Sequence, residues 1–140
     1  MIFSRFLIMF IFSFALLNSN SSNSQNLNKS QVKTLFDNFN EQSQTPFKYK
    51  VLEDFLKEVK IEDLKKGNVF EKEVLFENFD CDCKDKMQIS YDKSTKVFII
   101  QIYEASFVKD LDWCPEHSYI GTFKIIDDRI VNTKFNLIAG

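Results

Sequence analysis

The chain has 140 residues and a nearly balanced charge, with 18 basic and 20 acidic side chains and a net charge of −2. Nucleic-acid and anionic-membrane binding both call for a basic face, so this balance argues against either kind of partner. Only three glycines are present, too few for the glycine-rich loops that hold phosphates or dinucleotides. Eleven of the 16 phenylalanines lie after residue 24 and supply enough apolar surface for one well-filled core, and the length leaves no room for a second domain.

Residues 1–24 have the pattern of a secretory signal peptide. Arg5 precedes an apolar run from Phe6 to Leu17, and the polar segment Asn18–Ser24 follows it. The apolar run falls short of the roughly 20 residues that cross a bilayer. Cleavage can fall anywhere from Asn18 to Ser24. We favour the position before Gln25 and expect a secreted or periplasmic product of residues 25–140 that keeps no membrane anchor.

Two amphipathic helices are expected at the start of the exported domain. Their apolar residues recur at positions i, i+3, i+4 and i+7: Val32, Leu35, Phe36 and Phe39 in the first helix, and Leu52, Phe55, Leu56 and Val59 in the second. Asn28 or Ser30 can cap the first helix, and Thr45-Pro46 is typical of the start of the second. Gly67 is typical of a helix C-terminus, so the second helix should end there, with fraying around Lys60–Leu64.

After Gly67 the apolar period changes to two, which indicates β-strands. Five strands are expected, over residues 69–79, 87–91, 97–107, 119–126 and 130–138. The third is the most apolar, so we expect it at the centre of the sheet. The short polar connections Asp92-Lys93-Ser94 and Asp127-Asp128 favour hairpins and therefore antiparallel neighbours.

Together these elements predict an α+β domain, in which the two N-terminal amphipathic helices pack on a curved five-strand antiparallel meander. The order of elements resembles that of the cystatin-like and nuclear-transport-factor-like cones, which wrap a bent sheet around a helix. The resemblance is one of architecture only. No motif of either family is matched, so it implies no functional residues.

The three cysteines, the only histidine and the only tryptophan are expected at one end of this sheet. In a meander, alternate connections lie at the same end, so the turn Asp80–Asp85 and the loop Val108–His117 should meet. The strands that they follow are two apart, about 10 Å, which loops of this length can bridge. The residues brought together are Cys81, Cys83, Trp113, Cys114 and His117.

Three chemistries compete for this cluster. Export favours a disulfide between Cys114 and either Cys81 or Cys83, which leaves one cysteine over. The set Cys81, Cys83, Cys114 and His117 instead has the donors of a tetrahedral zinc site, although Cys-x-Cys is tighter than the usual ligand spacing. Redox chemistry by the close cysteine pair is disfavoured, because the neighbouring aspartates oppose thiolate formation. We favour the disulfide and expect no cofactor.

Binding is favoured over catalysis. His117 with Ser118 or Cys114 offers a base and a nucleophile, but a single histidine on a loop is usually solvated, and no nucleophile elbow is present. We expect an exported binding module of the protein-interaction, accessory or inhibitor/immunity type, with Trp113, His117 and Tyr119 as candidate interface residues. The alternative is a carrier of a small apolar ligand in a cavity between sheet and helices. Pairing of an exposed edge strand with its own copy also leaves a homodimer open.

Overall fold

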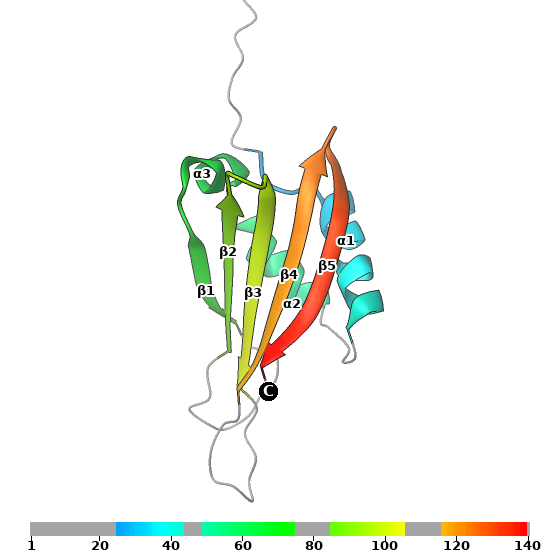
Figure 1. Ribbon diagram of the computed structural model, residues 1–140, viewed down its shortest axis with the longest axis vertical. Helices are drawn as coiled ribbons and strands as arrows, with labels where there is room; N and C mark the ends of the chain where they lie inside the picture. Colours follow the sequence, from blue (N-terminus) through cyan, green and yellow to red (C-terminus); the bar gives the residue numbers. More distant parts are fainter. Residues whose placement is uncertain (1–24, 44–48, 75–84, 106–115, 140) are drawn as a thin grey trace, which may run out of the picture.

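The computed structural model describes residues 25–43, 49–74, 85–105 and 116–139 (Figure 1). The predicted signal peptide, the Thr45-Pro46 dipeptide, the three cysteines and Trp113 lie outside these ranges. The elements in chain order are α1 (Lys29–Gln42), α2 (Tyr49–Lys57), α3 (Ile61–Lys66), β1 (Phe70–Val74), β2 (Asp85–Asp92), β3 (Val97–Ala105), β4 (Glu116–Ile126) and β5 (Arg129–Ala139). In this part of the chain, no helix is long and apolar enough to span a bilayer.

The five strands form one antiparallel sheet in the order β1-β2-β3-β4-β5. The α+β class, the meander and the central place of the third strand are therefore confirmed. The β4–β5 connection is a tight hairpin, in which Asp127 and Asp128 have φ values of 49° and 59°. Positive φ at both central residues is what a type I′ turn requires, and its twist matches that of the flanking strands.

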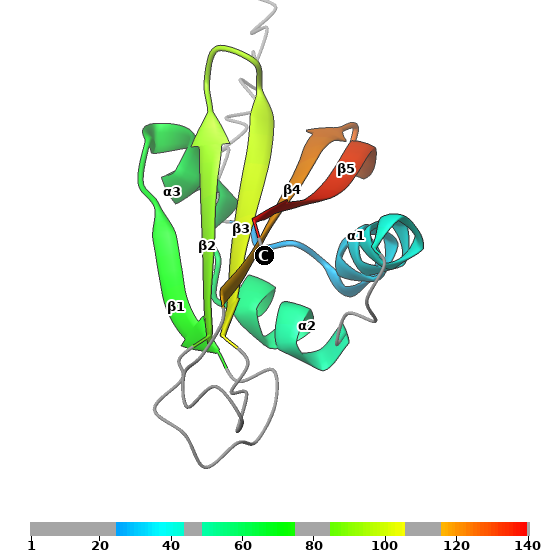
Figure 2. The ribbon, with the colours of Figure 1, turned by 60° about the horizontal axis from the view of Figure 1, so that its bottom comes forward.

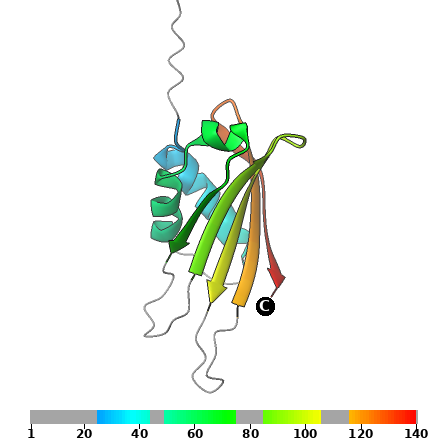
Figure 3. The same ribbon diagram turned by 90° about the vertical axis from the view of Figure 1, so that its left-hand side faces the viewer.

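The helices lie on one side of the sheet, which curves around them (Figure 2, Figure 3). The side chains that the strands bury alternate along each strand and share this inner face, as a period of two predicts. Four phenylalanines are fully or almost fully buried between the two layers: Phe39, Phe55, Phe98 and Phe123. The rings of Phe98 and Phe123 stack across β3 and β4 with centroids 5.2 Å apart.

The start of α1 is fixed by a capping box. The Asn28 side chain accepts a hydrogen bond from the Gln31 backbone N–H (2.9 Å), and the Gln31 side chain accepts one from the Asn28 N–H (2.8 Å). Of the two caps that the sequence offers, the structure uses Asn28. The apolar stripe of α1 then faces the sheet, with Val32, Leu35 and Phe39 buried.

The expected second helix is divided into α2 and α3. Lys60 adopts an extended conformation and is the N-cap of α3, so the helix stops at Lys57 and starts again at Ile61. The break lets Val59 and Ile61, on either side of it, both be buried. Gly67 ends α3 in the left-handed region (φ 106°), and its N–H donates to Leu64 O at 2.9 Å. The predicted stop is confirmed, whereas fraying between residues 60 and 64 is replaced by a clean break.

Two strands begin earlier than expected. Asp85, predicted in the first turn, is the first residue of β2, and His117, predicted in the third loop, lies within β4. The backbone pairing of the strands continues past the last apolar residues of the alternating pattern, since Val74 pairs with Asp85 and Glu104 with His117. Backbone hydrogen bonds extend the strands here, and they leave no trace in the hydrophobic period.

Candidate functional site

At one end of the sheet, the inner face changes from apolar to polar. Glu104 on β3 and His117 on β4 are Cα partners, and continuing the β2–β3 register by one residue places Asp85 opposite Glu104. Cβ atoms at such cross-strand positions lie about 4.5–5.5 Å apart. Asp85 is 6% exposed, while Glu104 and His117 are half-buried. This polar row, Asp85-Glu104-His117, brings two carboxyl groups beside the only histidine of the chain.

The polar row lies where the β1–β2 and β3–β4 connections leave the sheet, at the lower end in Figure 1. The pairs Val74–Asp85 and Ala105–Glu116 close the two ladders at this same end. The connections themselves, residues 75–84 and 106–115, hold the three cysteines and Trp113 and lie outside the described residues. The shared end of the sheet is thus observed, and the disulfide between Cys114 and Cys81 or Cys83 stays a prediction.

A metal site is not formed by the residues that the structure describes. Among them, no group of three or more histidine, cysteine, aspartate or glutamate side chains is placed to hold a metal ion. Of the predicted zinc set, His117 alone falls within the described ranges.

The predicted pairing of His117 with Ser118 as base and nucleophile is not formed. Successive residues of a strand point to opposite faces. His117 shares the inner face with Glu104, whereas Ser118 pairs with Tyr103 on the outer face. The other candidate nucleophile, Cys114, lies outside the described residues.

Tyr119, predicted at an interface, is half-buried on the inner face. Its ring stacks on Phe135 with centroids 5.6 Å apart and planes inclined by 8°. Phe135 in turn stacks on Phe39 of α1 at 4.9 Å. These rings fill the space between α1 and β4–β5, which is where an apolar-ligand carrier would need a cavity. The carrier hypothesis stays a prediction without a supporting observation in this region.

The free edge of β5 is partly covered by a side chain. The Gln42 side-chain carbonyl accepts a hydrogen bond from the Phe135 N–H (3.1 Å), and its amide group donates to Thr133 O (3.4 Å). Gln42 therefore occupies the place that a neighbouring strand would take beside Thr133 and Phe135, while Leu137 and Ile138 farther along β5 are exposed. The β1 edge carries three consecutive charged residues, which oppose pairing with another strand.

The outer face of the sheet is covered by none of the described helices (Figure 3). Its centre, which we call the outer patch, consists of four half-buried, uncharged residues: Ile99 and Gln101 on β3, and Ile120 and Thr122 on β4. Solvent-facing sides of antiparallel sheets are usually polar. Here two isoleucines occupy the central positions.

Charged side chains lie on both sides of the outer patch. Glu71 and Glu73 stand on β1, and Lys86 on β2 lies 3.3 Å from Glu71 and 5.1 Å from the centre of the Tyr103 ring. On the opposite side stand Lys124 of β4 and Lys134 of β5. The face is therefore uncharged in the middle, acidic along β1 and basic along β4–β5.

No relative accounts for these features. The chain matches no protein-family model, no curated protein and no solved structure. The resemblance to the cystatin-like and nuclear-transport-factor-like cones thus stays a prediction from the order of elements.

The described residues therefore offer two features, the polar row on the inner face and the outer patch on the outer face. On its face of the sheet, His117 has the carboxyl groups of Glu104 and Asp85 as cross-strand neighbours, and Tyr119 is the next inward-facing residue of β4. The outer patch combines an uncharged centre with charges of opposite sign on its two sides. The alternation along β3 that buries Phe98, Ile100 and Ile102 also places Ile99 and Gln101 on the opposite face, and this is the sequence signal of the outer patch.

Proposed function

We propose that this protein is an exported binding module that docks a protein partner on the outer face of its sheet, centred on the outer patch. The observation that supports this function is the uncovered face itself, with Ile99 and Ile120 at its middle. Ile99 and Ile120 are diagonal neighbours across β3 and β4, and apolar side chains that group outside the core are one mark of an interaction site. Export is part of the proposal and rests on the pattern of residues 1–24.

The charge distribution specifies the partner. A complementary surface has an apolar centre, basic groups that face Glu71 and Glu73, and acidic groups that face Lys124 and Lys134. Neither of these lysines has an ion-pair partner among the described residues. Charges at the rim of an interface mainly accelerate association and set orientation, so binding should weaken as salt rises.

The size of the face indicates a reversible complex. Five strands about 4.8 Å apart and about 8 residues long at 3.3 Å each give a face of roughly 20 by 26 Å. That is about 500 Å² on each partner, below the roughly 800 Å² per partner of a standard stable interface. We therefore expect the complex to be weak enough that one charged substitution in the outer patch abolishes binding of the partner.

Site-specific photo-crosslinking in the exporting cell tests this function. A photo-reactive residue at Gln101, within the outer patch, is compared with one at Thr34, an exposed position on α1. We expect a crosslinked product from Gln101 only, and its loss in the variant Ile120→Lys. The matched control Thr34→Lys, with the same added charge, should keep the product.

The mass of the crosslinked product identifies the partner as a second copy or as another protein. Either identity supports docking at the patch. Equal products from both positions, a Gln101 product that survives Ile120→Lys in a folded protein, or no product would each refute it. Circular dichroism of both lysine variants establishes that they are folded.

A further inference from the structure

The charge on the outer face of the sheet changes sign from one side of β3 to the other. Toward β1, the face carries three carboxylates and one lysine, namely Glu71, Glu73, Asp92 and Lys86. Toward β5, the charged side chains that the structure describes are Lys124, Arg129 and Lys134. The middle strand, β3, contributes no charge to this face. The face therefore has an acidic rim, an uncharged middle and a basic rim.

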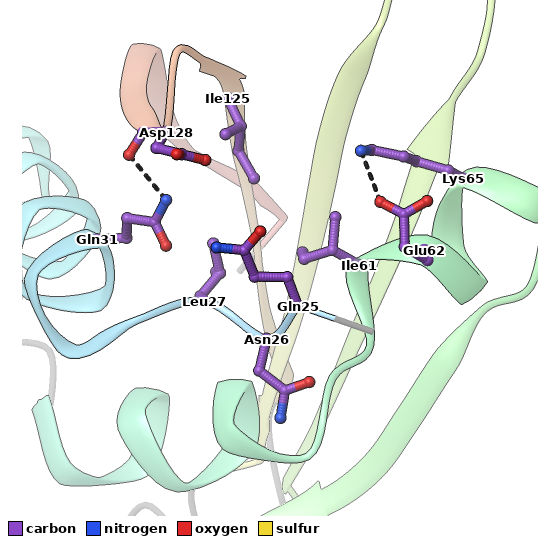
Figure 4. A pocket seen from close by; sticks show the side chains of 9 residues that line it. All are labelled: Gln25, Asn26, Leu27, Gln31, Ile61, Glu62, Lys65, Ile125 and Asp128. Atoms are coloured by element: carbon purple, nitrogen blue, oxygen red, sulfur yellow. Dashed lines mark hydrogen bonds and ion pairs between the residues drawn. The ribbon is translucent and has the colours of Figure 1, made fainter. Parts of the chain in front are cut away.

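The cations of the basic rim lack partners of the kind that several helical cations have. Ion pairs within the helices join Lys33 with Asp37, Lys50 with Asp54 and Lys65 with Glu62. Figure 4 shows the last of these pairs beside a small pocket between α3 and the β4–β5 turn. In the part of the chain that the structure describes, Lys124, Arg129 and Lys134 form no such pair. The basic rim is thus available to carboxylates of another molecule.

We infer that the partner at the outer patch is a second copy of this chain, packed face to face about a two-fold axis parallel to β3. This inference rests on the proposed function, because it names the molecule that docks there. Such an axis places β1 of one copy opposite β5 of the other, and β3 opposite β3. The acidic rim of each copy then meets the basic rim of the other, so that one contact is made twice. An axis across the strands would instead place β1 opposite β1 and bring like charges together.

The strand register aligns one charged pair across this axis. Asp92 pairs with Val97, and continuing the β3–β4 register by one residue places Lys124 level with Val97 on its other side. Asp92 of one copy therefore lies opposite Lys124 of the second copy, and the same pair recurs by symmetry. At the axis itself, Ile99 of one copy meets Ile99 of the other and supplies the apolar contact.

A second charged pair lies closer to the rims. Glu71 is level with Gln101, and Lys134 is level with Ile99, two residues or about 7 Å away along β3. Glu71 has Lys86 of its own chain at 3.3 Å, and its carboxylate can accept a further hydrogen bond from the second copy. Because the sheet curves around the helices, the outer face is convex, and only long charged side chains can join the rims (Figure 3). We expect a weak dimer that dissociates as salt rises.

Sedimentation equilibrium of the protein recovered from exporting cells tests the dimer. We expect a monomer–dimer equilibrium that shifts toward monomer at high salt. Glu71→Lys and Lys134→Glu should each weaken dimerisation about tenfold, because each turns two attractive contacts of the dimer into repulsive ones. An equimolar mixture of the two variants should dimerise as well as the parent. In the mixed dimer, the two reversed residues face each other at one contact, and the unchanged Glu71 and Lys134 face each other at the second.

Two charge-matched controls lie on α1, on the other side of the sheet. Lys29→Glu and Glu41→Lys change exposed positions there and should leave dimerisation unchanged, alone or mixed. Circular dichroism establishes that all four variants are folded. A dimer that neither outer-face reversal weakens, or that the mixture of the two does not restore, would overturn the face-to-face arrangement.

The Gln101 crosslink separates the dimer from docking in general. A protein that stays monomeric at every concentration but gives a Gln101 product with another protein would overturn the second copy as partner and leave docking on the outer patch in place. A monomer that gives no Gln101 product would overturn both.

Discussion

Gly121 lies on β4 at the point where the ring of Phe39 reaches the sheet from α1. A Cβ atom added at this position would stand 2.5 Å from Cζ and 2.6 Å from Cε2 of Phe39, closer than carbon atoms pack. Phe39 is fully buried and stacks on Phe135, so its ring has little freedom to move aside. Gly121→Ala therefore tests whether close contact between α1 and the sheet depends on the missing side chain.

The expected loss of stability follows from two opposing terms. Gly121 is not among the residues with positive φ, so alanine is compatible with its backbone. In open space the substitution would stabilise the fold by about 0.4–1 kcal/mol through the unfolded chain. Overpacking of a filled core costs about 1–3 kcal/mol and disturbs the Phe39–Phe135 stack as well. We expect Gly121→Ala to lower the free energy of unfolding by about 1–2 kcal/mol, or Tm by about 4 °C for each kcal/mol.

A double-mutant cycle with Phe39→Leu isolates the contact. Leucine lacks the Cζ and Cε atoms that meet the new methyl group, so Gly121→Ala should become neutral or stabilising in the Phe39→Leu background. Urea unfolding followed by far-UV circular dichroism gives all four free energies. An equal loss in both backgrounds, or no loss in the parent protein, would refute the packing argument.

Three further predictions concern turns and caps. Gly67→Ala should lower the free energy of unfolding by about 1 kcal/mol, because φ is 106° at this position. Crowding adds no cost, since the nearest side-chain atom, Lys93 Nζ, would be 3.6 Å from the new methyl group. Gly67→Asn should cost less, and equal melting temperatures of the parent and both variants would contradict this prediction. Asn28→Ala removes the cap of α1 and should cost about 1 kcal/mol in urea unfolding, whereas Asn28→Asp should keep most of it; equal losses in both would argue against the cap. Hydrogen bonds from Ser94 and Thr95 lower the pKa of Asp92 from 3.8 to about 2. The ionised carboxylate therefore stabilises the fold fully above pH 3.8, and this stabilisation is lost as the pH falls through about 2. Asp92→Asn should therefore destabilise the protein at pH 7, and the difference in urea midpoint should close near pH 2; a difference independent of pH would contradict the assignment.

Much of the architecture is predictable because local chemistry and burial agree. The stripes that bury Leu35 and Leu52 have helical spacing, and the aspartates at 127 and 128 tolerate the left-handed conformation that their hairpin needs. The third strand is apolar on both faces, as befits a strand with a neighbour on each side. At each of these positions, the residue type that the local backbone favours is also the type that the packing requires.

The remaining features depend on contacts that a linear pattern does not contain. The break at Lys60 is set by the burial of Val59 and Ile61 against the sheet, and both residues also fit a continuous helix. The polar row arises because the ladders continue through Asp85 and His117, which have no apolar period to reveal them. The sequence predicts the correct end of the sheet for His117 but not the face on which its side chain lies.

Substitution of the two isoleucines of the outer patch tests whether this face of the sheet serves folding or binding. Threonine is β-branched like isoleucine and suits a solvent-facing strand equally well, so a face that only has to fold and stay soluble gains little from Ile99 and Ile120. We expect the double variant Ile99→Thr/Ile120→Thr to lower the free energy of unfolding by about 1–2 kcal/mol, since each isoleucine is only partly buried. The same variant should lose the Gln101 crosslink. A loss of stability of about 3 kcal/mol or more, comparable to a truncated core residue, would assign the isoleucines to the fold and remove the main support for docking on this face.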